Sequence, residues 1–155
     1  MRAIAIDAEL LVLLIVGAAS PEFIEKHRRL NAYTAADFQL LGSIIGPADQ
    51  VLVTPNALTE ASNLLGYVSE PIRTLLYATF REMVAGLEER YVQSSHAATR
   101  EEFLRLGLAD SAMLEAVKGG AILLTADLDL YLAAISGGRE AINFVHAREA
   151  AGLIP

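Results

Sequence analysis

Short apolar runs, separated by segments with helical periodicity, constrain the fold of this chain most strongly. Four such runs are predicted to be buried strands because each is too short for a typical helix. They cover residues 3–6, 50–53, 121–124 and 141–145, with a weaker fifth candidate at 91–94. Largely apolar strands that alternate with helices predict a parallel sheet covered on both faces.

Helical patterns fill the segments between these runs. Thr54 stands before Pro55, and Gly66 follows the last periodic residue, so a capped helix is predicted over 55–65. The other predicted helices cover 10–17, 22–30, 34–45, 70–90, 108–118 and 128–135. No internal repeat or linker interrupts the pattern. The sequence therefore predicts one domain over residues 1–155, a three-layer α/β/α fold with a central parallel sheet of four to five strands.

Composition limits the kinds of site that this chain can have and the compartment in which it works. The chain has no cysteine, which excludes disulfides and sulfur-based zinc sites and fits a reducing compartment. The apolar stretch at 10–19 is half of the roughly 20 residues that cross a bilayer. Asp7 and Glu9 stand where a signal peptide carries neutral or basic residues. We therefore expect a cytoplasmic protein that does not associate with membranes.

Acidic residues recur where the predicted strands end and the helices begin. Asp7 follows the first strand, and Asp127 follows the strand at 121–124. Glu60 and Asp110 lie in early turns of helices, each at a position whose helical neighbours are mostly apolar. Helices that follow parallel strands begin at the edge where those strands end, and ligands bind at that edge. The four carboxylates are therefore expected to meet there.

Each acid also has an ordinary interpretation when it is taken alone. Asp7 suits a helix N-cap, and Asp110 and Asp127 suit the positive end of a helix dipole. Thr125 is predicted to be the N-cap of the helix at 128–135. Glu60 at the edge of an apolar stripe can reach solvent. Single residues leave these alternatives open.

The four acids together indicate a metal site. Clustered carboxylates repel one another and raise their own pKa values unless a cation is present. Mg²⁺ and Mn²⁺ are the hard ions that oxygen ligands prefer. Four further residues are auxiliary candidates for the site: Glu9, Asn63, Thr125 and Asp129.

Four segments of the chain resemble, in order, the motifs of the PIN-domain family, the VapC-like metal-dependent ribonucleases. The segments are IDAELLV at 6–12, VTPNALTEASNLL at 53–65, LGLADSAMLEAV at 106–117 and ILLTADLDLY at 122–131. The resemblance places the acidic catalytic and metal-binding positions of the family on Asp7, Glu60, Asp110 and Asp127. Glu9 departs from the pattern, because the family often has a small polar residue there.

This resemblance implies an Mg²⁺- or Mn²⁺-dependent endoribonuclease that hydrolyses phosphodiester bonds of single-stranded RNA. Its settings in the family are the toxin of a toxin–antitoxin pair, with an antitoxin protein as partner, or a stand-alone RNA-processing nuclease. A homodimer is a further expectation from the family. The alternative is a catalytically inactive PIN-like domain that serves as a protein-interaction module.

Charge distribution weighs against a general nucleic-acid coat. The net charge is −7 and the isoelectric point is about 4.9, whereas such proteins are normally basic. The densest basic run, at 26–29, is predicted to be a solvated helix face, with phosphate contact as the alternative. The remaining arginines of interest are dispersed and would form a patch only in the fold or in a dimer: Arg73, Arg81, Arg90, Arg100 and Arg105.

Three other chemistries lack their required residues. A phospho-accepting receiver domain needs a lysine after a late strand, and neither lysine of the chain stands there. An aspartate-nucleophile phosphatase needs an Asp-x-Asp pair after the first strand, where this chain has Asp7-Ala8-Glu9. No phosphate-binding glycine loop occurs. The histidines lack metal-ligand spacing and are predicted to be surface or edge residues: His27, His96 and His146.

Overall fold

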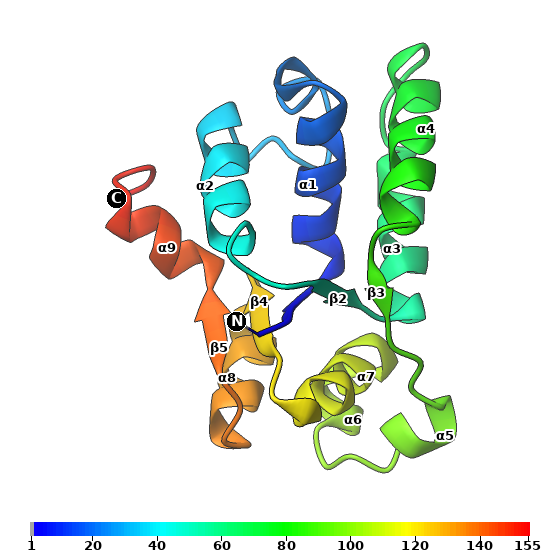
Figure 1. The fold of residues 1–155 in the computed structure, drawn as a ribbon, viewed down its shortest axis with the longest axis vertical. Coiled ribbons are helices and arrows are strands. Elements are labelled where there is room, and N and C mark those ends of the chain that lie inside the picture. The colour runs from blue at the N-terminus through cyan, green and yellow to red at the C-terminus, as the bar shows by residue number, and fades with distance from the viewer. Residues whose placement is uncertain (1) are drawn as a thin grey trace.

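A single five-stranded sheet forms the centre of the computed structural model, which describes residues 2–155. Its order is β3-β2-β1-β4-β5, and every pair of neighbouring strands is parallel. The strands are β1 (Ile4–Ile6), β2 (Val51–Val53), β3 (Glu88–Glu89), β4 (Ile122–Thr125) and β5 (Ala141–Asn143). Helices cover both faces, so the predicted three-layer α/β/α fold is confirmed (Figure 1).

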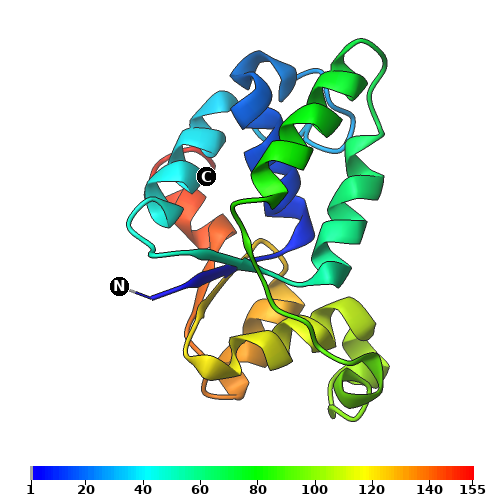
Figure 2. The same cartoon turned by 45° about the vertical axis from the view of Figure 1, so that its right-hand side comes forward.

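The helices divide into two layers around the sheet, which Figure 2 shows passing between them. One layer contains α1 (Ala8–Ala19), α2 (Ala35–Ile45), α3 (Pro55–Leu65), α4 (Ile72–Val84) and α9 (Phe144–Ala150). The other contains α5 (Ser94–Ala97), α6 (Phe103–Leu106), α7 (Leu108–Ala116) and α8 (Leu128–Ser136). Single 3₁₀ turns follow α1 and α7, at Pro21–Phe23 and Val117–Gly119. No helix within residues 2–155 is both long and apolar enough to cross a membrane.

Side chains of the central strands alternate between two cores. Ile4 and Ile6 pack in the core beneath α1, whereas Ala5 between them packs in the core beneath α7 and α8. The same alternation separates Val53 from Leu52. Because both faces are covered, nearly every position of such a strand is apolar. This requirement explains why the sequence locates β1, β2 and β4 correctly.

Caps define the first-layer helices. The Thr54 hydroxyl accepts a hydrogen bond from the Ala57 N–H at 3.1 Å, so α3 begins at Pro55 as predicted. In α2 the Asp37 carboxylate accepts from the Thr34 N–H at 2.8 Å, which makes Thr34 the cap of the predicted helix. A Cβ at Gly17 would lie 2.1 Å from the Phe38 ring. Glycine therefore permits the close approach of α1 and α2.

The predicted helix at 22–30 is wrong, because turns follow the 3₁₀ helix at Pro21–Phe23. His27 is 1% exposed, and its Nδ1 accepts from the Arg29 N–H at 3.2 Å. Its Nε2 therefore carries the proton and donates to the Leu65 carbonyl at 3.2 Å. These bonds tie the segment to the end of α3. His27 is thus no surface residue, and the basic run at 26–29 is no helix face.

Errors in the predicted strands and helices also have local causes. The segment at 91–94 is not a strand, and the predicted helix at 70–90 ends at Val84, before β3. β3 carries Glu88 and Glu89, because an edge strand need not be apolar. The predicted strand at 141–145 ends at Asn143, whose side chain caps α9 by accepting from the Val145 N–H at 2.9 Å. Helices α5, α6 and α9 were not predicted, and α7 ends at Ala116 rather than at residue 118.

A buried ion pair fastens α9 to α2. Arg148 Nε donates to Asp37 Oδ1 at 2.7 Å, and its Nη2 donates to the Ala32 carbonyl at 2.7 Å. Asp37 is 1% exposed, so its charge depends on this partner and on the Thr34 cap. Removing one member of a buried pair leaves an uncompensated charge, which is strongly destabilising.

We therefore expect Arg148→Ala to lower the free energy of unfolding by about 3–5 kcal/mol in urea denaturation. The control is Arg2→Ala, which breaks the exposed pair between Arg2 and Glu140 and should leave the midpoint nearly unchanged. Equal midpoints for the two variants would contradict a stabilising role for the Asp37–Arg148 pair.

Candidate metal centre

Five carboxylates line one cavity of about 320 Å³ at the carboxyl edge of the sheet. The other lining residues are alanines, and no lysine, arginine or histidine lines the cavity. The carboxylates belong to Asp7, Glu9, Glu60, Asp110 and Asp127. The four acids predicted to meet thus border one space, and Glu9 joins them. The other auxiliary candidates, Asn63, Thr125 and Asp129, do not line it.

Asp7 combines a capping role with a place in the cavity. Its Oδ1 accepts from the Leu10 N–H at 3.4 Å and thereby caps α1. Its Oδ2 accepts a hydrogen bond from the Thr125 hydroxyl. Thr125 is fully buried at the end of β4, and its hydroxyl in turn accepts from the Asp127 N–H at 3.0 Å. Thr125 is therefore not the N-cap predicted for α8, but it joins Asp7 to Asp127.

Asp127 is the actual cap of α8. Its Oδ1 accepts from the N–H groups of Asp129 and Leu130, at 2.9 and 3.2 Å. Its side chain is exposed, and within residues 2–155 its Oδ2 has no hydrogen-bond partner. One oxygen of Asp127 therefore orients the carboxylate, and the other is available to a ligand.

Asp110 and Glu60 reach the cavity from α7 and α3. Gly107, with φ of +84°, turns the chain into α7, so that Asp110 lies half-buried in the first helical turn. Glu60 is exposed rather than held within the apolar stripe of α3. Asn63 is also exposed and shares with Glu60 a separate cavity of about 450 Å³. The structure shows no hydrogen bond between these two side chains in the described chain.

The cavity disfavours negative charge on two of its carboxyl groups. Burial raises the pKa of Asp7 to about 7, against the opposing hydrogen bonds from Thr125 and Leu10, and Glu9 and Asp110 raise it further. Burial also raises the pKa of Asp110 to about 6, with contributions from the nearby Asp127, Glu60 and Asp129. A bound cation would stabilise the charged form of both carboxyl groups and would therefore oppose both shifts.

The donor set suits a hard divalent ion in its chemistry and charge. All five side chains present oxygen, and the chain has no cysteine to favour a softer metal. With the side chains as they lie, no group of three or more His, Cys, Asp or Glu residues within 2–155 is arranged to hold a metal ion. Ligation would therefore require side-chain movement, and Asp7, Glu60, Asp110 and Asp127 are the residues that would hold the ion.

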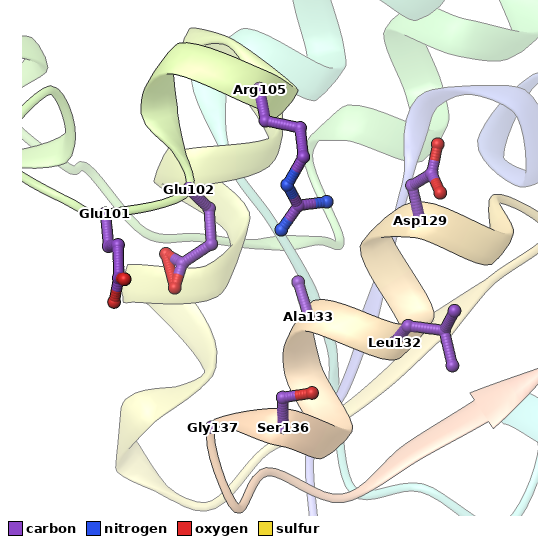
Figure 3. Close-up of a pocket in the computed structure, with 8 residues that line it drawn as sticks. All are labelled: Glu101, Glu102, Arg105, Asp129, Leu132, Ala133, Ser136 and Gly137. Carbon is purple, nitrogen blue, oxygen red and sulfur yellow. The ribbon is translucent and has the colours of Figure 1, made fainter.

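A larger cavity of about 600 Å³ lies along α8, and its lining includes Asp129, whose charge is near enough to Asp110 to raise the pKa of that residue. Figure 3 shows it extending from Asp129, in the first turn of α8, to Gly137 at its end. Arg105 reaches into this space from α6, between Glu102 and Asp129. Glu102 pairs with Arg100 at 2.9 Å, whereas Arg105 has no ion-pair partner in the described chain. From the sequence, Arg105 was one of five dispersed arginines, and nothing distinguished it from the other four.

The wall that carries Arg105 is anchored to α7 through Glu115. This carboxylate, 6% exposed, binds the side chains of Arg100, His96 and Lys118. Burial alone would raise the pKa of Glu115, but the hydrogen bonds from these three side chains lower it to about 2. The anchor ties α5 and the segment that leads into α6 to α7.

Tyr33 contacts an acid of the cavity although the sequence does not predict it. The Tyr33 hydroxyl donates to Glu9 Oε2 at 2.5 Å, across 24 residues of chain. Tyr33 lies in a turn between α1 and α2, and nothing in its local sequence indicates contact with an acid.

Comparison with known proteins adds no identity: no protein-family model matches the chain, and no curated protein matches its sequence. The geometry of the two cavities and the resemblance of the four segments are therefore the support for a functional proposal.

The raised pKa values predict how the metal-free protein responds to pH. Because Asp7 and Asp110 have folded-state pKa values above the ordinary 3.8, the folded protein binds more protons than the unfolded chain between about pH 4 and pH 7. Its free energy of unfolding should therefore fall as pH rises through this window. Asp7→Asn removes the charge and keeps one acceptor oxygen for the Leu10 N–H, while its amide group can donate to the Thr125 hydroxyl oxygen in place of the bond that Asp7 accepts. In chelator at pH 8 we expect this variant to be more stable than wild type by about 2 kcal/mol, allowing for solvent screening.

The measurement is urea denaturation in chelator at pH 4 and pH 8. The gain from Asp7→Asn should nearly vanish at pH 4, where wild-type Asp7 is protonated. Glu22→Gln, an exposed acid on the first 3₁₀ turn, is the control and should show no pH-dependent gain. If the Asp7→Asn protein is less stable than wild type at pH 8, the negative charge of Asp7 does not destabilise the folded protein.

Proposed function

We propose that this protein is an Mg²⁺- or Mn²⁺-dependent endoribonuclease that hydrolyses phosphodiester bonds in single-stranded RNA. The observation that carries the proposal is the convergence of Asp7, Glu60, Asp110 and Asp127 on one cavity without any lining cation. This cavity lies at the edge where parallel α/β sheets bind ligands. The ordered resemblance to the PIN-domain family supplies the choice of RNA as the substrate.

The lining residues support hydrolysis by water. The cavity offers only carboxylates and alanines, and hence no serine, cysteine or lysine nucleophile. The nearby Thr125 hydroxyl is committed to donating to Asp7. A bound divalent ion would polarise the phosphodiester and lower the pKa of a water molecule. Asp7 and Asp110 would supply partly buried charge that holds such an ion, and the exposed Glu60 can accept hydrogen bonds from water.

The larger cavity supports a path for the RNA strand. It begins at Asp129, two residues beyond the Asp127 of the acidic cavity, and runs along α8. Arg105 is the one lysine or arginine that lines either cavity, and it lacks an ion-pair partner among the described residues. A guanidinium group suits a phosphate, which it can bind through two N–H groups. We infer that Arg105 contacts the phosphate of a nucleotide next to the cleaved bond.

Cleavage of a mixed panel of single-stranded RNAs in Mn²⁺ tests the activity. Asp110→Asn and Asp7→Asn should each lower kcat/KM at least about 100-fold, because each removes charge on which metal-assisted hydrolysis depends. Glu22→Gln should cleave like wild type. Mn²⁺ should also raise the melting temperature of wild type but not of Asp110→Asn, since it binds the folded protein. Cleavage that survives chelator and both aspartate substitutions would end the metal-nuclease proposal.

The strand path is tested by Arg105→Ala. We expect the KM for RNA to rise about 5–10-fold, and the dependence of log affinity on log salt to weaken by about 0.7, the value for one phosphate contact on a single strand. Arg105→Lys should recover part of the affinity, because it keeps the charge and loses the bidentate geometry. Arg81→Ala, an exposed arginine at the end of α4, is the matched control. If Arg105→Ala and Arg81→Ala give the same KM, Arg105 does not contact the strand.

An inactive protein-interaction module is the second candidate. The exposed apolar face of α8 favours it, because Leu128, Leu132 and Ile135 are 54%, 48% and 45% exposed at helical spacing. Such a face can bind a partner protein. A wild-type protein that neither cleaves RNA nor binds Mn²⁺ would make this the better function.

A further inference from the structure

Tyr33 contacts both Glu9 at the acidic cavity and the C-terminal helix α9. Its ring is 7% exposed, and its hydroxyl donates to Glu9 Oε2 at 2.5 Å. Glu9 lines the acidic cavity, and its Oε1 has no hydrogen-bond partner in residues 2–155. One oxygen of Glu9 is therefore held by Tyr33, while the other is free for a ligand.

Contacts from α9 fix the ring of Tyr33. The Arg148 guanidinium carbon lies 4.8 Å from the centre of the Tyr33 ring, and Phe144 lies 6.3 Å away, centre to centre. Arg148 is itself held by Asp37 and by the Ala32 carbonyl. The chain of contacts thus runs from the buried Asp37–Arg148 pair through Tyr33 to Glu9.

The hydroxyl of Tyr33 acts as a donor toward Glu9. Burial raises the pKa of Tyr33, and the adjacent Glu9 carboxylate raises it further, so the proton stays on the phenol. A carboxylate that only compensated the dipole of α1 would need no such partner, because the helix N-terminus already favours it. Ligating carboxylates, by contrast, are commonly oriented by hydrogen bonds from neighbouring groups.

We propose that Tyr33 is a positioning residue that holds Glu9 at the acidic cavity as a fifth ligand for the divalent ion. This inference rests on the proposed function, because it assumes that the four other carboxylates bind that ion. It assigns Glu9 to the site on its contacts, although Glu9 departs from the pattern that the sequence resembles. It also explains why a turn residue between α1 and α2 is buried against α9.

The test measures Mn²⁺ affinity directly by isothermal titration calorimetry, without RNA. Tyr33→Phe removes only the hydroxyl and should weaken Mn²⁺ binding about 10-fold, the lower range for losing a group that orients a ligand. Glu9→Gln should weaken binding at least as much. The control is Tyr77→Phe, which also removes a hydroxyl hydrogen bond, from Tyr77 to the Ser62 carbonyl at 2.7 Å, but away from the acids. It should leave Mn²⁺ affinity unchanged.

A double-mutant cycle separates positioning from general stability. If Tyr33 acts through Glu9, Tyr33→Phe should have no further effect on Mn²⁺ affinity in the Glu9→Gln background. An equal loss in both backgrounds would mean that Tyr33 only supports the fold, and it would overturn the inference. Unchanged affinity in Tyr33→Phe, while Asp110→Asn abolishes binding, would overturn the inference and leave the metal site intact. A wild-type protein that binds no Mn²⁺ would overturn both.

Discussion

The burial of carboxylates close together, at the carboxyl edge of the sheet, is the constraint that the rest of this structure has to satisfy. Parallel topology brings the ends of β1 and β4 together, and with them Asp7 and Asp127. Burial is the largest cause of the raised pKa values of Asp7 and Asp110, and the neighbouring acids raise them further, so charging both groups costs free energy. The fold tolerates this cost because two apolar cores, one on each face of the sheet, stabilise the elements that carry the acids.

The same aspartates serve the fold and the cavity, so capping and ligand binding are not competing interpretations. Asp127 uses Oδ1 to accept from two backbone N–H groups at the start of α8. Asp7 likewise uses Oδ1 for α1, and its Oδ2 meets the Thr125 hydroxyl. A cap fixes a carboxylate at a helix start, and in this topology helix starts face the cavity. Hydrogen bonds to ligating carboxylates are common in metal sites, so capping by Oδ1 is compatible with ligation once the side chains move together.

Sequence predicted the parts of the structure that depend on local or repeated signals. The central strands are apolar because both faces are buried, and α3 is bounded by Thr54 and Gly66. Contacts between distant residues carry no such signal. His27 is buried through the carbonyl of Leu65, and Tyr33 meets Glu9 through the fold alone. β3 was misplaced because an edge strand of two glutamates has no apolar pattern.

The acidity of the chain need not prevent contact with RNA, because local charge rather than net charge decides where a strand can bind. Two of the basic residues in the layer of α5 to α8, Arg100 and Lys118, already form ion pairs with Glu115. Arg105 has no ion-pair partner among the described residues, and it faces the cavity that begins at Asp129, two residues beyond Asp127. A single arginine offsets little of the repulsion from five carboxylates at short range. An RNA strand could therefore enter only after the acids are neutralised, and in this proposal a divalent ion at the acidic cavity is a condition of substrate binding as well as of hydrolysis.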